Sequence, residues 1–312
     1  MIRSTIHDAE NRLSVKTLCV LAGVSRSSYY YWLKNSCSAA RCNKEAQDEL
    51  DYRLIREAYD FRGYAKGVMG IHMRLLHIGI RMNHKKIRRL MHKFGLVCPL
   101  RKANPYRRMA KAMKTNAVAD NQLKRRFKAY GARRVFLTDI TYIPFGKAFL
   151  YLSVILDAYT EQVMSYELSD SLEIDFVLAT VEKLIRNHGT SIDATAMIHS
   201  DQGCHYTSTS FRKLISDHGL RQSMSRRGNC WDNAPQESFF GHMKDELDIK
   251  VRNWQSLQDV QHSIDDWMDY YNNDRYKVGL GKMSPNEFYR YLTTGNYPTM
   301  LGQASKKIIP CP

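Results

Sequence analysis

Two aspartates inside otherwise apolar, strand-forming segments are the feature that most constrains this chain. Asp139 lies in the stretch VFLTDITYI, after the apolar run Val135–Leu137. Asp201 lies in MIHSDQGCHYTS, after the run Ala194–Ile198. Short β-branched runs of this kind are typical of buried strands. A carboxylate in such a strand costs stability unless it is paired or bound to a metal. The pattern therefore predicts two strands that carry functional aspartates.

A third acid, Glu237, follows the helix-start signal Asp-Asn-Ala-Pro and is predicted to lie in the early turns of a helix. Sixty-one residues separate the two aspartates, and thirty-five separate Asp201 from Glu237. Two strand carboxylates and one helix carboxylate can converge as ligands for Mg²⁺, with substrate phosphates completing the shell. Two such ions, about 4 Å apart, activate an attacking hydroxyl and stabilise the leaving oxygen of a phosphodiester. Three ordinary structural acids are the alternative, but the apolar contexts favour catalysis.

The three acidic motifs resemble a known family. The strings TDITYI, HSDQGCHYTS and DNAPQESFF are similar to those of bacterial transposases of the insertion-sequence-three family, whose catalytic core is similar to retroviral integrase. The resemblance runs from about Val15 to Tyr289. It implies an α/β RNase H-like (integrase) catalytic core, preceded by all-α helix-turn-helix-type DNA-binding segments. It also implies a DDE transposase that uses Mg²⁺, which Mn²⁺ can replace, with Asp139, Asp201 and Glu237 as catalytic and metal-binding residues.

Further expectations come with this resemblance. Lys244 lies seven residues after Glu237, nearly two helical turns, so both occupy one helix face where an ammonium can bind a DNA phosphate. A solvated surface lysine is the alternative from spacing alone. The family also implies copy-out, paste-in transposition through a circular intermediate. This chain would be the downstream reading frame, active as a homo-oligomer on DNA and as a frameshift fusion with an upstream-frame protein.

The charge is distributed unevenly. The net charge is +16, yet residues 1–130 hold 28 Lys and Arg against 9 Asp and Glu, a net of +19, and residues 131–312 have a net of −3. A basic N-terminal part and a mildly acidic C-terminal part indicate a polyanion-binding module followed by a metal-dependent catalytic module. The expected partners are therefore the terminal inverted repeats of a DNA element and its target DNA.

Residues 14–33 predict a helix, a turn at Gly23 and a second helix capped by Ser25. Leu18, Leu21 and Ala22 form the apolar face expected for the first helix. In a DNA-binding helix-turn-helix, the groove-facing start of the second helix would carry Arg26, Ser27 and Ser28. An ordinary helical hairpin is the alternative, and the basic surroundings favour DNA binding.

A second helical unit follows, with helices expected at 48–59, 71–77 and from Asn83 to Phe94. Five cations share one side of the third helix: Lys85, Lys86, Arg88, Arg89 and Lys93. Charged faces are usually only solvated, but same-sign clustering favours phosphate binding. The segment Val68–Arg74 departs from the Tyr-Gly-x-Arg-Arg-Ile run of the resembled family, which weakens residue assignments there.

From Val135 the pattern changes to strand-like runs at 135–143, 148–156 and 163–168, with Pro144 and Gly146 in the first turn. A helix at 172–187, a strand at 194–200, a helix at 207–218, a strand at 221–225, the Glu237 helix and a helix at 256–273 follow. This is the element order of an RNase H-like core. The chain is thus predicted to contain a helix-turn-helix segment (1–45), a second such basic domain (46–97), a basic linker (98–128), the catalytic core (129–294) and a tail (295–312).

Other groups near the motifs have structural interpretations. Asp157 is expected to cap a turn with Tyr159 and Thr160, and Asp232 or Asn233 to cap the Glu237 helix. His199 shares a strand face with Asp201 and is either a supporting residue or a satisfied core histidine. Arg275 and Lys277, in the closing string YNNDRYKVGLGKMSPNEFYR, are candidates for packing and phosphate contact.

The chain has seven cysteines without a zinc-type spacing, no secretory signal and no apolar run long enough to span a bilayer. We therefore expect a cytoplasmic, nucleoid-associated bacterial protein with reduced thiols. Two rival functions stay open. One is a non-catalytic DNA-binding regulator or inhibitor of transposition, which leaves the three acids without a role. The other is a structure-selective nuclease that cuts DNA but never joins strands.

Overall fold

The computed structural model describes residues 2, 5, 10–33, 35–99, 123, 128–225, 233–248 and 254–298. The described chain forms two compact units, residues 1–57 with 85–96, and residues 58–84 with 97–312. Most of the predicted linker, the end of the predicted tail, Cys230, Trp231 and Asp232 lie outside the described residues. None of the described helices combines the length and apolar character that crossing a bilayer requires.

The first unit is helical. Its helices are α2 (Val15–Leu21), α3 (Arg26–Leu33), the larger part of α4 (Asn35–Asp60) and nearly all of α6 (His84–Lys93). Helix α2 begins at Ser14, whose hydroxyl accepts a hydrogen bond from the Thr17 N–H at 3.2 Å, and Gly23 follows it with a φ of 64°. The Ser25 hydroxyl caps α3 by accepting the Ser28 N–H at 3.1 Å. The predicted helix, turn and capped helix are confirmed.

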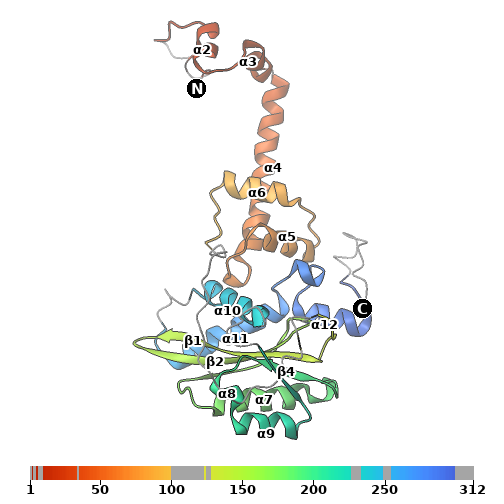
Figure 1. The fold of residues 1–312 in the computed structure, drawn as a ribbon. Helices are drawn as coiled ribbons and strands as arrows, with labels where there is room; N and C mark the ends of the chain where they lie inside the picture. The colour runs from red at the N-terminus through yellow and green to blue at the C-terminus, as the bar shows by residue number, and fades with distance from the viewer. Residues whose placement is uncertain are drawn as a thin grey trace. The chain divides into compact units, whose positions relative to one another are not determined.

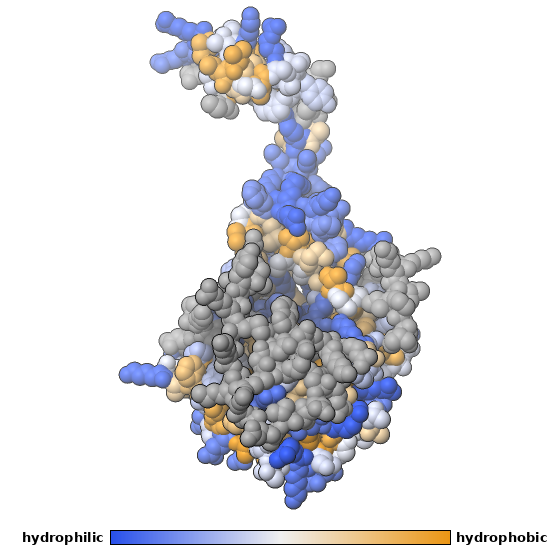
Figure 2. All heavy atoms as spheres, in the orientation of Figure 1, coloured by the Kyte–Doolittle hydropathy of each residue, from blue (hydrophilic) through white to orange (hydrophobic). Residues whose placement is uncertain are grey.

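The apolar face expected for α2 is only partly correct. Leu18 is buried, but Leu21 is 72% exposed, and Cys19 takes its place in the interior. Apolar side chains gather on the surface over α2 and α3 (Figure 2). On the neighbouring helix, the Arg41 guanidinium lies 4.0 Å from the Trp32 ring centroid and donates to the Trp32 carbonyl.

The second unit is built around a five-stranded sheet in the order β3-β2-β1-β4-β5. The strands are β1 (Val135–Phe145), β2 (Ala148–Asp157), β3 (Val163–Ser169), β4 (Met197–Ser200) and β5 (Arg221–Met224). β1, β2 and β3 are antiparallel neighbours, whereas β4 is parallel to β1 and β5 is parallel to β4. Three consecutive strands, followed by strands that alternate with helices, give the mixed sheet of the RNase H-like fold predicted from the sequence.

Helices cover both faces of this sheet (Figure 1). They are α7 (Asp175–His188), α8 (Cys204–Thr207), α9 (Thr209–Asp217), α10 (Ala234–Glu246), α11 (Leu257–Asn273) and α12 (Pro285–Thr294). One core joins side chains of β1 and β2 to α10 and α11, with Trp267 fully buried in it. The other joins the opposite face to α7 and α9, around Phe136 and Phe211. Because side chains alternate between the two faces along a strand, Leu137 and Asp139 of β1 both lie on the face that α10 covers.

The segment before the sheet is anchored to the same unit. It holds a short 3₁₀ turn, Phe61–Gly63, and helix α5 (Val68–His77). Arg62 bonds Asp274 at 2.8 Å and Asp269 at 2.5 Å, both at the end of α11. Further along, His77 bonds Glu287 of α12 at 3.2 Å. These contacts join residues more than 200 positions apart, so α5 is held by α11 and α12 and not only by its sequence neighbours.

Several boundaries differ from those the sequence predicts. Pro144 is not in the hairpin turn but inside β1, opposite Phe149, and the chain reverses at Gly146. A proline is tolerated there because it lies at the end of the ladder. Helix α7 begins at Asp175, since the Ser171 hydroxyl accepts the Glu173 N–H and forms a turn first. The helix expected at 207–218 is divided by Ser208, which caps α9.

Candidate active site

Asp139 and Asp201 are brought together by the pairing of β1 with β4. The parallel register pairs Val135 with Met197 and Leu137 with His199. The same offset, continued for two positions, places Asp201 beside Asp139, just after β4 ends at Ser200. Neighbouring strands in a sheet are about 4.8 Å apart. The two aspartates, which sixty-one residues separate in the chain, thus meet at one point of the sheet.

The electrostatics of Asp139 bring in the other two predicted residues. Burial raises the pKa of Asp139 to about 8, and the negative charges of Asp201 and Glu237 add to this rise. The Ile140 N–H, which donates to Asp139 Oδ1 at 2.8 Å, and the positive charge of Lys244 act in the opposite direction. All four predicted side chains therefore share one electrostatic environment centred on Asp139.

The Asp201 loop is held by two neighbours in the HSDQG motif. Asp201 is exposed, and its Oδ1 accepts the Gly203 N–H at 2.9 Å. A Cβ at position 203 would also lie 2.9 Å from that oxygen, closer than such atoms approach. The Gln202 side chain donates to the Ser225 carbonyl at 3.0 Å, which ties the loop to the end of β5. Glycine is needed here because of the close approach of the carboxylate.

Helix α10 carries Glu237 and Lys244. Glu237 lies exposed in its first turn, and Lys244, half-buried, lies in its last. The adjacent Gln236 is fully buried and donates to the Val154 carbonyl at 3.3 Å. Val154 is the residue that pairs with Asp139 across β1 and β2. One side chain therefore fastens the start of α10 beside the strand position that carries Asp139.

Sequence reasoning missed three supporting residues. Besides Gly203 and Gln236, Tyr206 is buried beneath the site, with its hydroxyl 3.5 Å from Thr138 Oγ1. Burial raises the pKa of Tyr206 well above its ordinary value, and the charges of Asp139 and Asp201 act in the same direction. The Gly two residues after Asp201 was a usable signal, since such a pair often forms a side-chain-capped turn. Nothing in the local sequence marks Gln236 or Tyr206.

The other predicted structural roles have mixed outcomes. Asp157 caps its turn as expected, accepting from the N–H groups of Tyr159 at 2.8 Å and Thr160 at 3.0 Å. His199 is a satisfied core histidine, fully buried with Ser223 Oγ at 2.9 Å. Asn233 occupies the N-cap position of α10 but makes no side-chain capping bond.

The atoms near Asp139 that could bind a metal ion are all carboxylate oxygens, which are the ligands that hard divalent cations prefer. In the described ranges, no group of three or more His, Cys, Asp or Glu side chains is close enough to enclose a metal ion unaided. Mg²⁺ does not require such an enclosure. It usually keeps several waters and is bound by one or two carboxylates together with substrate phosphates. The adjacent pair Asp139 and Asp201 meets that requirement.

The predicted DNA-binding residues fall into two groups. Arg26, Ser27 and Ser28 are exposed at the start of α3, where Ser27 and Ser28 also hydrogen-bond Ser25. Of the α6 cations, three pair with acids of α4: Arg89 with Asp48 at 2.6 Å, Lys93 with Asp48 at 3.0 Å, and Lys86 with Asp51. Lys85 and Arg88 are exposed on the other side of α6, and a hydrophilic surface covers this region (Figure 2).

Comparison with known proteins agrees with this fold. Two models, both described as integrase core domain, match residues 129–230 and 218–285, and a model described as HTH-like domain matches residues 45–104. Fold and site together define the class: an integrase-type core, the scaffold of polynucleotidyl transferases, preceded by a helix-turn-helix-like segment.

Relatives identify the family within that class. The transposase for insertion sequence element IS904 of Lactococcus lactis is 32% identical over 254 residues, 80% of this chain and 96% of the relative. The putative transposase InsK for element IS150 of Escherichia coli is 29% identical over 270 residues, 86% of this chain and 90% of the relative. The chain belongs to the transposases of bacterial insertion sequences.

One solved structure has a low similarity to part of the chain. The HTLV-2 integrase catalytic core domain, solved in complex with magnesium, is 14% identical. It covers 51% of this chain and 98% of its own, with a TM-score of 0.40.

Proposed function

We propose that the chain cleaves DNA strands at the ends of an insertion sequence and transfers them to target DNA, with Asp139, Asp201 and Glu237 as the catalytic acids. The observation that carries this proposal is the parallel pairing of β1 with β4, whose register continues to place Asp201 beside Asp139. Asp201, Glu237 and Lys244 all act on the pKa of Asp139, although the four residues are spread over more than 100 positions of the chain. Placing carboxylates next to one another costs stability, and a cation-dependent phosphoryl transfer gives that cost a purpose.

In this proposal Asp139, Asp201 and Glu237 would hold two Mg²⁺ ions, with Mn²⁺ as a substitute. When bound, the two ions supply activation of the attacking oxygen and stabilisation of the leaving oxygen. The protein's own residues position the DNA strand. Lys244, on the Glu237 face of α10, binds a phosphate next to the scissile bond. Gly203 and Gln236 orient Asp201 and the start of α10.

The remaining parts of the proposal concern partners. The basic front end binds the terminal inverted repeats, mostly through phosphates, and a homo-oligomer assembles on the DNA. The chain acts as the downstream-frame product, joined by frameshifting to an upstream-frame protein, in the cytoplasm on the nucleoid. A strand-transfer assay with element-end oligonucleotides and Mg²⁺ tests the function. Joined products support it, binding without reaction indicates a regulator, and cleavage without joining indicates a nuclease.

Two neighbouring arginines of α6 are expected to behave differently. Arg88→Ala should weaken DNA binding and reduce the slope of log affinity against log salt by about 1, as expected for one lost phosphate contact. Arg89→Ala should mainly lower the melting temperature, because it leaves buried Asp48 without its bidentate partner. Arg89 and Lys93 hold the pKa of Asp48 well below its usual value. Fluorescence anisotropy at several salt concentrations and a thermal melt measure both effects, and equal salt slopes for Arg88→Ala and wild type would contradict the assignment.

Gly203→Ala is expected to slow strand cleavage by about 10- to 100-fold, because the added methyl displaces the Asp201 carboxylate. DNA affinity and melting temperature should change little, since Asp201 is exposed and position 203 needs no unusual backbone angle. Gly67→Ala is the matched control, because Gly67 is likewise an extended N-cap residue, at the start of α5, and a Cβ there meets nothing within 4 Å. Cleavage by Gly203→Ala at the rate of the control would show that the Asp201 position is not critical.

A further inference from the structure

The first turn of α10 has the residues of a capping box but not its hydrogen bonds. In a capping box, the N-cap side chain accepts the N–H of the third helical residue, and the side chain of that residue accepts the N–H of the N-cap residue. Asn233 and Gln236 occupy these two positions. Asn233 makes no side-chain capping bond, and the Gln236 amide instead donates to the Val154 carbonyl at 3.3 Å. The box at the start of the helix that carries Glu237 is therefore open.

Two other helices of the same unit have the closed form of this motif. Helix α11 begins with Ser256 and Asp259, and helix α12 begins with Ser284 and Glu287. In both pairs the two reciprocal hydrogen bonds are present. The open box is therefore a property of α10 and not of helix starts in this unit generally.

The open box leaves two oxygen atoms without hydrogen-bond donors. Asn233 is 5% exposed and Gln236 is fully buried. Among the residues that the structure describes, neither Asn233 Oδ1 nor Gln236 Oε1 has a hydrogen-bond partner. The Gln236 nitrogen must face the Val154 carbonyl, because a carbonyl only accepts, so the unpaired atom is the oxygen. A buried acceptor without a donor raises the free energy of its conformation, and closing the box would pair both oxygens.

Gln236 and Glu237 compete for one position over the sheet. Gln236 is bonded to Val154, the residue opposite Asp139, whereas Glu237 is exposed. Neighbouring helix residues point about 100° apart, so only one of the two can face the sheet at a time. In the part of the chain that the structure describes, the three acids do not form a group that could hold an ion together. Glu237 therefore needs a rotation of the first turn to reach a cation at Asp139.

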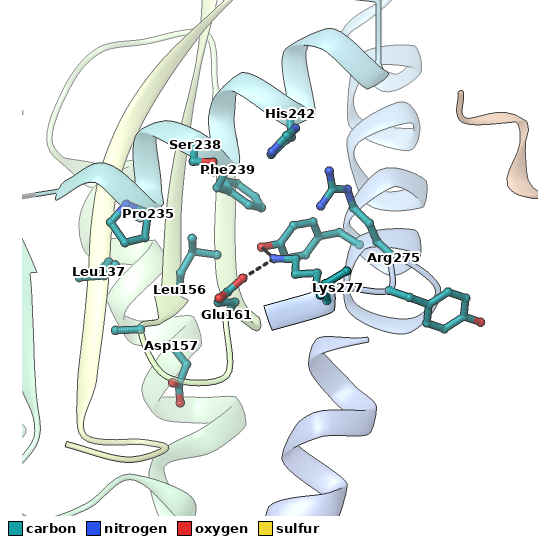
Figure 3. A pocket seen from close by; sticks show the side chains of 14 residues that line it. Leu137, Leu156, Asp157, Glu161, Pro235, Ser238, Phe239, His242, Arg275 and Lys277 are labelled. Carbon is teal, nitrogen blue, oxygen red and sulfur yellow. Dashed lines mark hydrogen bonds and ion pairs between the residues drawn. The ribbon is translucent and has the colours of Figure 1, made fainter. Parts of the chain in front are cut away.

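The surroundings of this turn leave room for such a rotation. Pro235 and Ser238, which flank Gln236 and Glu237 in the sequence, line a cavity of about 420 Å³ between α10 and residues 275–278 (Figure 3). On this side the turn adjoins a cavity instead of a packed core. The bond from Gln236 to Val154 is longer than the usual N–H···O distance of about 2.9–3.0 Å, so it opposes the rotation only weakly.

We propose that the capping box of α10 is a conformational switch that positions Glu237 for ion binding. In the open conformation, Gln236 holds the first turn to β2. In the closed conformation, Asn233 and Gln236 cap the helix and Glu237 turns towards Asp139. The inference rests on the proposed function, because it takes Asp139 and Glu237 as ligands of a divalent cation. Since only the closed conformation presents both carboxylates, ion binding and closure of the box stabilise each other.

The test measures Mn²⁺ binding to the full chain without DNA, by electron paramagnetic resonance of the free ion. Asn233→Ala removes a cap that is made only in the closed conformation, so it should weaken Mn²⁺ binding about fivefold, the effect of one lost N-cap bond. Its melting temperature without added metal should not fall, because the open conformation contains no such bond. Asn233→Ser, which can still cap, should keep the wild-type Mn²⁺ affinity.

Hydrogen exchange gives a second measurement. Addition of Mg²⁺ should slow the exchange of the backbone N–H groups of residues 233–237 at least about fivefold in the wild type and in Asn233→Ser, because closure of the box protects them. The same addition should have a smaller effect on Asn233→Ala. Asn233→Leu, which keeps the volume but cannot cap, decides if Asn233→Ala does not fold.

Ser256→Ala is the matched control, because Ser256 caps α11 in a box that is already closed. This substitution should lower the melting temperature both with and without metal, and it should leave the Mn²⁺ affinity unchanged. A cap that acts only on the stability of the fold behaves in this way, whereas the cap of α10 is expected to act on ion affinity alone.

The proposal is overturned if folded Asn233→Ala or Asn233→Leu binds Mn²⁺ as tightly as the wild type, or if it lowers the melting temperature without metal as Ser256→Ala does. Asp139→Asn, measured alongside, separates this inference from the proposed function. If the Mn²⁺ affinity depends on Asp139 but not on Asn233, the switch fails and the metal site stands. If the affinity is independent of Asp139, the proposed metal site itself fails.

Discussion

Asp139→Asn, Asp201→Asn and Glu237→Gln are each expected to reduce Mg²⁺-dependent strand cleavage by about a thousandfold or more, while DNA affinity stays near the wild-type value. The physical reason is the loss of one charged ligand from a group that needs its full negative charge. A thousandfold corresponds to about 4 kcal/mol of transition-state stabilisation, within the range that metal coordination supplies. Gel-resolved cleavage of labelled element ends measures the rate, and anisotropy measures the affinity.

A matched control separates this effect from a general loss of charge. Asp217→Asn, at the exposed end of α9, removes one carboxylate on the opposite face of the sheet from α10 and should leave cleavage unchanged. Chelation by EDTA should stop wild-type cleavage, and added Mg²⁺ or Mn²⁺ should restore it. Full activity in any of the three acid variants would remove that residue from the catalytic assignment.

Much of the core fold follows from local patterns in the sequence. Apolar, β-branched runs gave the positions of β1, β2 and β4, because buried strands need side chains that pack on both faces of a sheet. Capping signals were equally local. The Ser25 hydroxyl caps α3, as its sequence predicts. The ends of some elements were predicted less well. The start of α7 depends on the Ser171 hydroxyl, and the end of β1 depends on where the pairing with β2 stops, beyond Pro144.

The three acids proposed as catalytic could be recognised for a related reason. A carboxylate in an apolar run is costly, so its presence indicates a function from the local sequence alone. The residues that hold these acids in place could not be identified from the sequence. Gln236 contacts Val154 and Tyr206 contacts Thr138, and both partners are distant in the sequence. The identity of each side chain is known from the sequence, whereas its contact partner is determined by the fold.

The α6 cations illustrate the same limit. Their clustering favours phosphate binding, yet the fold places acids of α4, about 40 residues earlier in the chain, against part of the cluster. Arg275 is a similar case. The closing motif made it a candidate for phosphate contact, but its guanidinium is bonded to Glu246 of α10 at 2.8 and 3.0 Å. Its first task is therefore to join α10 to the segment after α11.

That pairing leads to a second large expected effect. Glu246→Ala should destabilise the catalytic unit by about 3–5 kcal/mol, the usual cost of removing one partner of a buried ion pair. Glu246 is nearly inaccessible, with 3% of its side chain exposed, and it also accepts the Trp267 indole N–H at 3.1 Å. The substitution leaves the Arg275 charge buried and the indole N–H without its acceptor. Urea unfolding, followed by tryptophan fluorescence and circular dichroism, measures the loss.

Two further variants separate charge from packing. Glu246→Gln keeps an acceptor for Trp267 and should cost less than Glu246→Ala, because only the charge is removed. The double variant Glu246→Met with Arg275→Met should be more stable than Glu246→Ala, since neither charge stays buried and the volume is filled. If Glu246→Ala instead unfolds at the wild-type urea concentration, the ion pair contributes nothing measurable. The attachment of α10, and with it the placement of Glu237, would then depend on the apolar contacts around Trp267 alone.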